Sequence, residues 1–447
     1  MRRAVAPLLA VTVALVLADS AVVTLALPDI LRTLDTSVEE VAWVLISFNL
    51  VLGLASVPAA MALSRVQPRV FSALGVAAFA GASAWCAVAD SIEVLIVARC
   101  VQALGGALAL VGCLELLVAT QGERRGVATW VTAGVVGTAA GPFAGGLLTE
   151  AISWQAIFVV QVPFAVLAVP AALAVRVEHA HPPDRHRPAV RANLTLALLS
   201  AALTAALFLL VLLLVEGWSR SPGTAAVTVS VVPVAALAAA PLARWLRPPP
   251  EVEVAVGCFL VAGGLVGLAL LPAADLAWTV APQALVGLGL GLTVDRLTSQ
   301  AMELRLPRAL HAGWTIGARH VGVVVGLAIL TPVFTADLYD AQEPAQLAIT
   351  SLVLDAPLQP QDKIAVAEAL GRELAGEEGR VPELSRAFDS LDLEPAERPA
   401  ADDLERALDD QLERAATFAF RDSFLIGAGL ALLAMLTVLV PHRRRTP

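Results

Sequence analysis

The side chains that could do chemistry in this sequence are a few ionisable residues inside long apolar runs. Asp19 lies in the first run and Arg99 in the fourth. If the runs are helices that cross a bilayer in alternating directions, Asp19 lies about 21 Å from one face and Arg99 about 9 Å from the other. These heights coincide in a hydrocarbon core of about 30 Å. We therefore predict an ion pair that depends on the protonation of the acid, as a proton-coupled site requires; a static bridge between two helices is the alternative.

Other ionisable residues lie in later runs. Glu115, and Asp295 with Arg296, come near the edge of the membrane by the same helical arithmetic, where long side chains reach water. We interpret them as interfacial or gating charges. Arg319 and His320 lie about 15 Å into the eleventh run, near the midplane. They form either a substrate or proton site that faces a cavity or a packed contact between domains, and the sequence favours neither.

The composition requires these runs to be membrane spans. Of the 447 residues, 58% are apolar and 15% are charged, whereas soluble domains have about 45–50% and about 25%. The chain contains twelve apolar runs of the roughly 20 residues that a spanning helix needs. We therefore predict an all-α polytopic membrane protein, for which nucleic acid is not an expected partner.

Basic residues in the short loops predict the orientation, because such residues are retained in the cytoplasm. With the N-terminus inside, 17 arginines fall on the cytoplasmic side and two, Arg32 and Arg220, fall outside. We expect a multi-pass protein of the cell membrane with both termini in the cytoplasm.

Two polar segments divide the chain. One is basic and contains proline, and it separates six spans from six. The other holds 20 acidic and 7 basic residues with apolar positions at helical spacing, which predicts a small external helical insertion. We expect a single helix from about residue 402 to 440, since no breaker precedes the last span. The predicted domains are an N-terminal bundle (1–176), a cytoplasmic linker (177–192), five helices of a C-terminal bundle (193–335), the acidic insertion (336–418), and the last span with a basic tail (419–447).

The fifth span is dense in glycine. Small residues three or four positions apart let helix backbones approach each other, and a glycine-proline pair permits a bend. On spacing alone, the pattern indicates only a packing face. Its members are Gly134, Gly137, Gly141, Pro142, Gly145 and Gly146.

Taken together, these segments resemble the major facilitator superfamily, and more narrowly its drug:proton antiporters, in a branch usually built with fourteen spans. The likeness lies in residues 19–28, in Ala98-Arg99 with Gln102, and in the 134–146 signature, with weaker matches at 287–291 and 318–322. It implies the major facilitator fold of two six-helix bundles. It assigns proton coupling to Asp19 and Arg99, and it assigns to the glycine signature a bend that favours export.

The loop after the second span departs from the family pattern. Ser64 stands where the family has an aspartate, followed here by Arg65 and Arg69. In the family, that aspartate is thought to latch the inner gate at the cytoplasmic face. The resemblance therefore leaves the gating of this chain open.

We therefore expect a secondary active transporter that exports an amphipathic organic compound in exchange for protons by alternating access. Export of a lipid-like molecule, guided by the external helices, is an alternative, and a receptor or scaffold that lost transport is another. No nucleophile-base pair or metal-ligand spacing is evident, so we expect no enzyme activity, metal or cofactor. The expected partners of this monomer are its small substrate, protons and the lipid bilayer.

Overall fold

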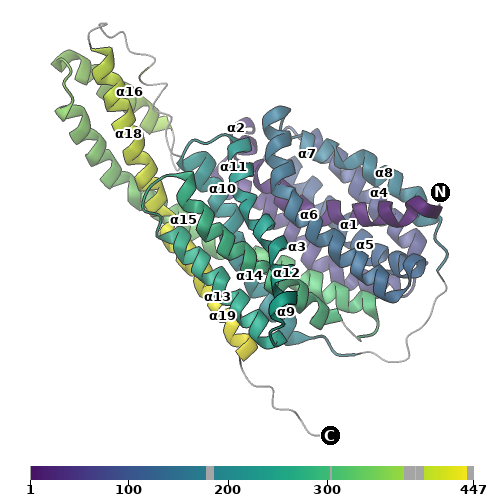
Figure 1. Cartoon of the computed structure of the whole chain (residues 1–447). Coiled ribbons are helices and arrows are strands. Elements are labelled where there is room, and N and C mark those ends of the chain that lie inside the picture. Colours follow the sequence, from purple (N-terminus) through teal and green to yellow (C-terminus); the bar gives the residue numbers. More distant parts are fainter. Residues whose placement is uncertain (1, 178–185, 303–304, 377–387, 389–396, 440–447) are drawn as a thin grey trace.

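The computed structural model describes the whole chain except residues 1, 178–185, 303–304, 377–387, 389–396 and 440–447. All regular elements within the described residues are helices (Figure 1). Twelve of these helices are long and apolar enough to cross a membrane. The predicted all-α polytopic fold with twelve spans is therefore confirmed.

The first six spans form the N-half. Local sequence signals fix several of their ends: Ser37 and Glu40 form a capping box, and Gly122 adopts a positive φ of 82° that lets one helix turn directly into the next. The helices are α1 (Arg2–Thr24), the short α2 (Leu27–Thr33), α3 (Val38–Leu63), α4 (Pro68–Ala87), α5 (Ile92–Gln121), α6 (Glu123–Ala151), α7 (Ala156–Val159) and α8 (Gln161–Leu173).

The last six spans form the C-half. Its first span contains two π-helical segments, and its second is interrupted at Ser230. The elements are α9 (Val190–Thr204), η1 (Ala205–Leu209), α10 (Leu210–Leu212), η2 (Leu213–Gly217), α11 (Pro222–Val229), α12 (Val231–Leu246), α13 (Pro250–Ala269), α14 (Leu276–Met302), α15 (Arg308–Asp355) and α19 (Arg421–Leu439).

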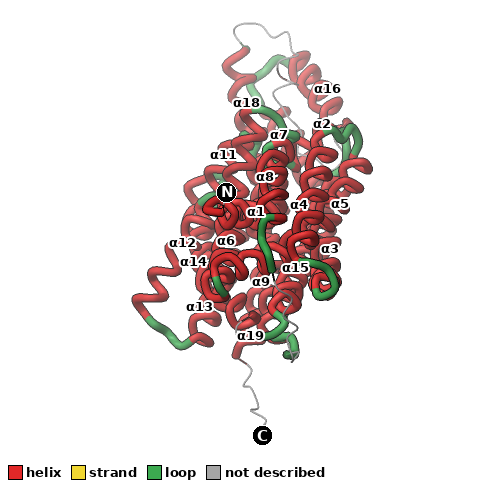
Figure 2. Tube along the Cα trace, turned by 90° about the vertical axis from the view of Figure 1, so that its right-hand side faces the viewer, coloured by secondary structure: helices red, strands yellow, loops and turns green. Residues whose placement is uncertain are grey.

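An arm projects from one end of the bundle (Figures 1 and 2). It consists of the outer part of α15 together with α16 (Pro360–Gly376) and α18 (Arg398–Ala419), which pack on it. We call the end with the arm the insertion end, and the opposite end, where α1 begins and α19 finishes, the terminal end. The arm has an apolar core of its own, which includes Val353, Leu370 and Leu408.

The base of the arm is bonded to the loop that follows η2. The Trp218 indole donates to the Thr417 hydroxyl at 2.9 Å, and Arg220 pairs with Glu413 at 3.3 Å. Trp218 is fully buried. The arm is therefore attached to the C-half both through continuous helices and through side chains.

The arm corrects two helix boundaries expected from the sequence. The helix of the eleventh span does not end with its membrane-spanning part, which finishes at Leu338, because α15 continues without a break to Asp355. The predicted helix over 402–440 begins earlier, at Arg398, and a turn at Phe420 divides it into α18 and α19. Pro399 in the first turn of α18 explains the earlier start, since proline suits the first helical positions.

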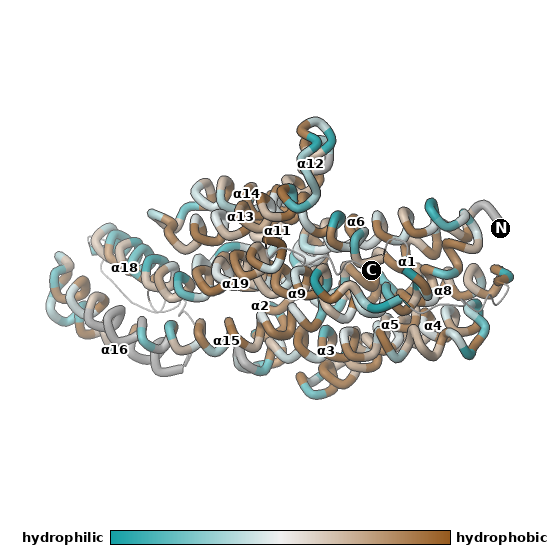
Figure 3. Tube along the Cα trace, turned by 90° about the horizontal axis from the view of Figure 1, so that it is seen from below, coloured by the Kyte–Doolittle hydropathy of each residue, from teal (hydrophilic) through white to brown (hydrophobic). Residues whose placement is uncertain are grey.

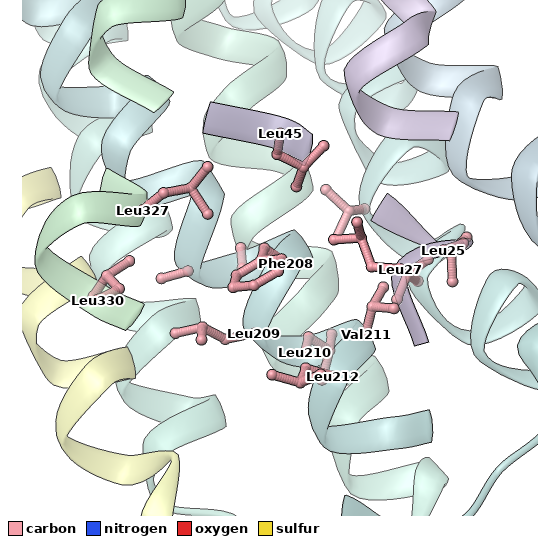
Figure 4. Close-up of a cluster of buried hydrophobic side chains, with 14 of the residues drawn as sticks. Leu25, Leu27, Leu45, Phe208, Leu209, Leu210, Val211, Leu212, Leu327 and Leu330 are labelled. Carbon is pink, nitrogen blue, oxygen red and sulfur yellow. The ribbon is translucent and has the colours of Figure 1, made fainter. Parts of the chain in front are cut away.

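The largest apolar cluster runs through the C-half, and toward the insertion end a part of it joins the two halves. It includes Leu27 and Leu45 of the N-half with Phe208 and Leu327 of the C-half. Figure 4 shows part of this cluster, with Phe208 among leucines from several helices. We call this joining part the apolar plug, because it packs between the halves at this end.

Deletion of residues 345–398 should leave a protein that still inserts into the membrane, because the core of the arm is separate from the two apolar clusters of the bundle. We expect a single symmetric peak in size-exclusion chromatography and an altered export rate or substrate range. Degradation or failed insertion of the shortened chain would instead show that the arm is needed for folding.

Candidate functional site

Asp19 of α1 and Arg99 of α5 form a fully buried ion pair. Both side chains are 0% exposed, and Arg99 Nη1 donates to Asp19 Oδ2. The contact predicted from their depths in the membrane is therefore confirmed. Two opposite charges that are both fully buried depend on each other, because either one alone would carry a large desolvation cost.

Two glutamines complete the coordination of the Asp19 carboxylate. Its Oδ1 accepts from Gln102 Nε2 at 3.1 Å and from Gln161 Nε2 at 2.9 Å. Gln102 also donates to the Ser83 hydroxyl at 2.9 Å and accepts from Arg99 Nη1 at 2.6 Å. The network therefore joins α1, α4, α5 and α8. The sequence indicated Gln102 but not Gln161 or Ser83, whose only signal was a polar side chain in an apolar run.

Aromatic rings contact the other side of Arg99. The guanidinium carbon lies 4.0 Å from the centre of the Phe48 ring and 5.7 Å from that of Phe158. Arg99 Nε donates to the Val44 carbonyl at 3.3 Å, while Nη2 has no hydrogen-bond partner among the described residues. Cation–π attraction thus supplements the single carboxylate.

A second polar chain crosses between the halves. The Ser20 hydroxyl, next to Asp19 on α1, donates to Asn49 Oδ1 at 3.2 Å, and His320 Nδ1 of α15 lies 2.7 Å from the same oxygen. Asn49 Nδ2 donates to the Leu45 carbonyl, which leaves Oδ1 as an acceptor and assigns the proton to His320 Nδ1. His320 therefore makes a contact between the halves, one of the two roles expected for it.

A cavity of about 900 Å³ lies between the halves. Its wall in the N-half is α6, and its walls in the C-half are α9 with η1, α12, α13, α14 and α15. It extends from Pro142 to the α12–α13 loop at the terminal end. Most of its lining is apolar, and all of its charged lining comes from the C-half: Arg244, Arg247, Glu253, Asp295, Arg296 and Arg319.

The residues expected near the membrane edge are divided between this cavity and a helix contact. Arg296 donates to Glu253 Oε2 from Nη2 at 2.6 Å and from Nε at 2.9 Å. Asp295 lines the cavity. Glu115 lies instead outside this lining, near Arg308 and Ala309 at the start of α15.

The glycine signature contacts two different neighbours. A Cβ at Gly137 or Gly145 would collide with the α1 carbonyls of Ala14 and Val22, and Gly134 and Gly141 also face α1. Gly146 faces α11 of the other half, where a Cβ would lie 2.7 Å from the Pro222 carbonyl. The signature therefore packs α6 within its own half and also, through Gly146, against the C-half.

The insertion end is closed by polar contacts as well as by the apolar plug. The Glu150 carboxylate of α6 accepts from the Ser221 hydroxyl at 3.1 Å and from the backbone N–H of Gly223. Arg32 of α2 pairs with Glu216 at 3.1 Å. Each contact joins the two halves.

At the terminal end, Arg308 of the C-half pairs with Glu123 of the N-half at 2.9 Å. The loop in which Ser64 replaces the family aspartate makes local hydrogen bonds: the Ser64 hydroxyl donates to the Met61 carbonyl at 2.7 Å, and Arg69 donates to Gln67 at 2.9 Å. In the part of the chain that the structure describes, Arg65 and Arg69 form no ion pair with the C-half.

Known proteins resemble parts of this chain. The tetracenomycin C resistance and export protein of Streptomyces glaucescens is 36% identical over 169 residues, which are 37% of this chain and 31% of that protein. Multidrug resistance protein Stp of Mycobacterium tuberculosis is 34% identical over 155 residues, covering 34% and 29% of the two chains. The matches therefore span about a third of each relative.

The fold and the family can be compared over longer stretches. A bacterial homolog of the human lysosomal transporter Spinster, in an inward-facing and occupied conformation, superposes with a TM-score of 0.65 at 16% identity, covering 98% of this chain and 97% of that one. At this identity, the likeness concerns the fold alone. The family model of the major facilitator superfamily matches residues 9–331. The chain therefore belongs to the major facilitator superfamily.

Proposed function

We propose that this protein exports an amphipathic organic compound in exchange for protons by alternating access. The observation that carries the proposal is the buried Asp19–Arg99 pair, a titratable charge pair inside a bundle whose two halves enclose a mostly apolar cavity. A buried acid inside a membrane is costly, and such groups commonly serve proton relays. The resistance and export proteins among the relatives support export as the direction.

The conformation is consistent with an inward-facing state. The cavity extends to the terminal end, while Glu150, Arg32 and the apolar plug close the insertion end. The arginine bias of the loops favours a cytoplasmic terminal end. In this proposal, cargo enters from the cytoplasmic side, and the two halves, connected by residues 177–192, rock as units to release it outside.

Proton exchange at Asp19 requires helix movement, because its carboxylate is fully buried. Protonation removes the charge that holds Arg99 and weakens the contact between α1 and α5. Ser20 on the same helix binds Asn49, which holds His320 of the C-half. Ser20 is the residue next to Asp19, so a shift of α1 at Asp19 would also move the Ser20–Asn49–His320 contact between the halves.

Export of a lipid-like molecule is a second candidate, favoured by the position of α12. The end of α12 stands apart from the rest of the bundle (Figure 3), although α12 forms a cavity wall opposite α6. Val136 of α6 and Leu237 of α12 both line the cavity, yet they are 50% and 57% exposed. A cargo with a long apolar chain could enter between these helices from the membrane.

The test is proton flux in proteoliposomes that contain the purified full chain and a pH-sensitive dye. Tetracenomycin C, methylenomycin A and a fluorescent lysophospholipid serve as trial cargo, the first two because related proteins are named for resistance to them. Proton movement on addition of cargo supports exchange, and its dependence on the lysophospholipid alone supports the lipid-like alternative. No cargo-dependent flux with any compound in a wider panel would favour the receptor or scaffold.

The proposed orientation predicts labelling from opposite sides of the membrane. In a background without the native cysteines, His186→Cys should react only from the cytoplasm, and Ser390→Cys, which lies outside the described residues, only from outside. An impermeant maleimide added to intact and to opened cells checks both. Reaction of both sites in intact cells would refute the twelve-span orientation.

A further inference from the structure

Arg319 differs from Arg99 and Arg296 in its partners. Arg99 has Asp19 and Arg296 has Glu253. Arg319, by contrast, has neither an ion pair nor a hydrogen bond with any described residue. It lies eleven residues into α15, about 17 Å from the start of that helix. A guanidinium is therefore held near the midplane of the membrane without a protein counter-charge.

The side chain of Arg319 faces the transport pathway. It lines both the central cavity and a smaller inner cavity, whose lining also includes Ser20, Asn49 and His320. Arg319 is thus at the junction between the open cavity and the polar chain that joins the halves. A group bound to Arg319 would lie next to the residues through which Asp19 is coupled to the C-half.

The charge around the cavity favours an anion. Four arginines and two acids line it, and one of these acids, Glu253, is neutralised by Arg296. The other acid, Asp295, is seven residues from the terminal end of α14, about 10 Å deep, and so lies nearer the mouth than Arg319. The inner part of the cavity therefore carries a positive charge opposite the apolar wall of α6.

Binding of an acidic group would offset the cost of holding the unpaired Arg319 guanidinium at this depth. Its planar group of N–H donors matches a carboxylate or phosphate, and charge-assisted hydrogen bonds are strong where water is scarce. A cationic cargo would instead be repelled by Arg319 as it approached the inner cavity.

We propose that the cargo carries an acidic group, a carboxylate or a phosphate, which binds Arg319 while its apolar body lies along α6, η1 and α12. The same cavity supplies the apolar surface, which includes Val135, Leu207 and Ala236. This inference rests on the proposed export function and specifies the cargo class for that same cavity.

The test is a fluorescence titration of the purified full chain in nanodiscs with three matched probes. These are dansyl-labelled undecanoic acid, its methyl ester and the corresponding amine. The acid should bind at least about tenfold more tightly than the ester, as hydrogen bonds to a charged group imply. The amine should bind no better than the ester. An amine that binds more tightly than the acid would overturn the proposal on the unmodified protein.

Substitutions test whether Arg319 is the residue that makes the acid bind more tightly than the ester. Arg319→Gln should reduce binding of the acid to the level of the ester, and Arg319→Lys should retain part of the preference, because it keeps the charge but loses the planar donors. Asp295→Asn should bind the acid more tightly, since it removes a like charge from the cavity. Arg414→Gln, on the exposed side of the arm, is the matched control for loss of an arginine. An unchanged preference for the acid in both Arg319 variants would contradict the assignment.

Competition distinguishes the source of the acid. Displacement of the bound probe by oleoyl lysophosphatidate indicates a lipid, and displacement by naphthoic acid indicates a water-soluble organic acid; displacement by neither would overturn the site. These titrations do not depend on transport. Acid binding without cargo-dependent proton flux would therefore contradict the export function alone, whereas proton-coupled export of cationic dyes without acid preference would contradict this inference alone.

Discussion

Asp19→Asn is expected to reduce export driven by a proton gradient to the level of protein-free liposomes while leaving a folded protein. Asparagine has the shape of aspartate and keeps one of its two oxygens, which can accept either from Arg99 or from the two glutamines. It cannot bind or release a proton in the transport cycle. Exchange of cargo between the two sides without a gradient should persist, because it needs the cavity but not the titration. Counterflow and uphill transport by the same preparation measure the two properties.

Two variants serve as controls for this result. Glu115→Gln makes the same chemical change in a carboxylate at the α5–α15 contact and should have a milder effect. Arg99→Ala should stop export and also lower the melting temperature, because removal of one partner of a buried pair costs about 3–5 kcal/mol. Uphill export by Asp19→Asn at the rate of the unmodified protein would exclude this carboxylate and direct attention to Asp295 and His320.

Gly146→Leu is expected to block transport by holding the insertion end open. A Cβ at Gly146 would already lie 2.7 Å from the Pro222 carbonyl and would collide with the Ala226 side chain. A leucine must therefore push α6 away from α11. We expect Thr204→Cys, buried at the inner cavity, to react faster with an impermeant maleimide from the insertion end when Gly146→Leu is present.

Gly81→Leu is the matched control, because nothing lies within 4 Å of a Cβ at that exposed position of α4. It should leave both transport and the labelling rate at residue 204 unchanged. If Gly146→Leu transports normally and labels like its parent, the contact between α6 and α11 is not a moving gate.

The Asp19–Arg99 contact was predictable because depth in a membrane is almost fixed by position along a helix. The remaining ligands of the site were not, because a contact also depends on how each helix is rotated and which helices are neighbours. Gln161, the first residue of α8, binds Asp19 through a third helix that depth alone does not place beside it.

The glycine signature shows the same limit. Its spacing predicted close packing, but adjacent residues of a helix point about 100° apart. Gly145 therefore faces α1 while Gly146 faces α11. In the arm, the change from apolar to polar residues after about 335 marked the place where α15 leaves the membrane, and the helix itself continues because helix formation does not require an apolar environment.

The arm also allows movement of the C-half to be measured with labels that lie outside the membrane. Between Leu338 and Asp355, α15 extends beyond its span by about 25 Å, and Trp218 and Arg220 attach α18 to the same half. A tilt of the C-half therefore displaces the outer end of the arm further than it displaces residues inside the membrane. A spin-label pair at Leu354 on the arm and Val88 at the insertion end of the N-half, both exposed, would report the rocking angle by distance measurement without a probe in the cavity. In electron cryomicroscopy of the protein in detergent, the arm would project from the micelle and give the particle images an asymmetric feature for alignment.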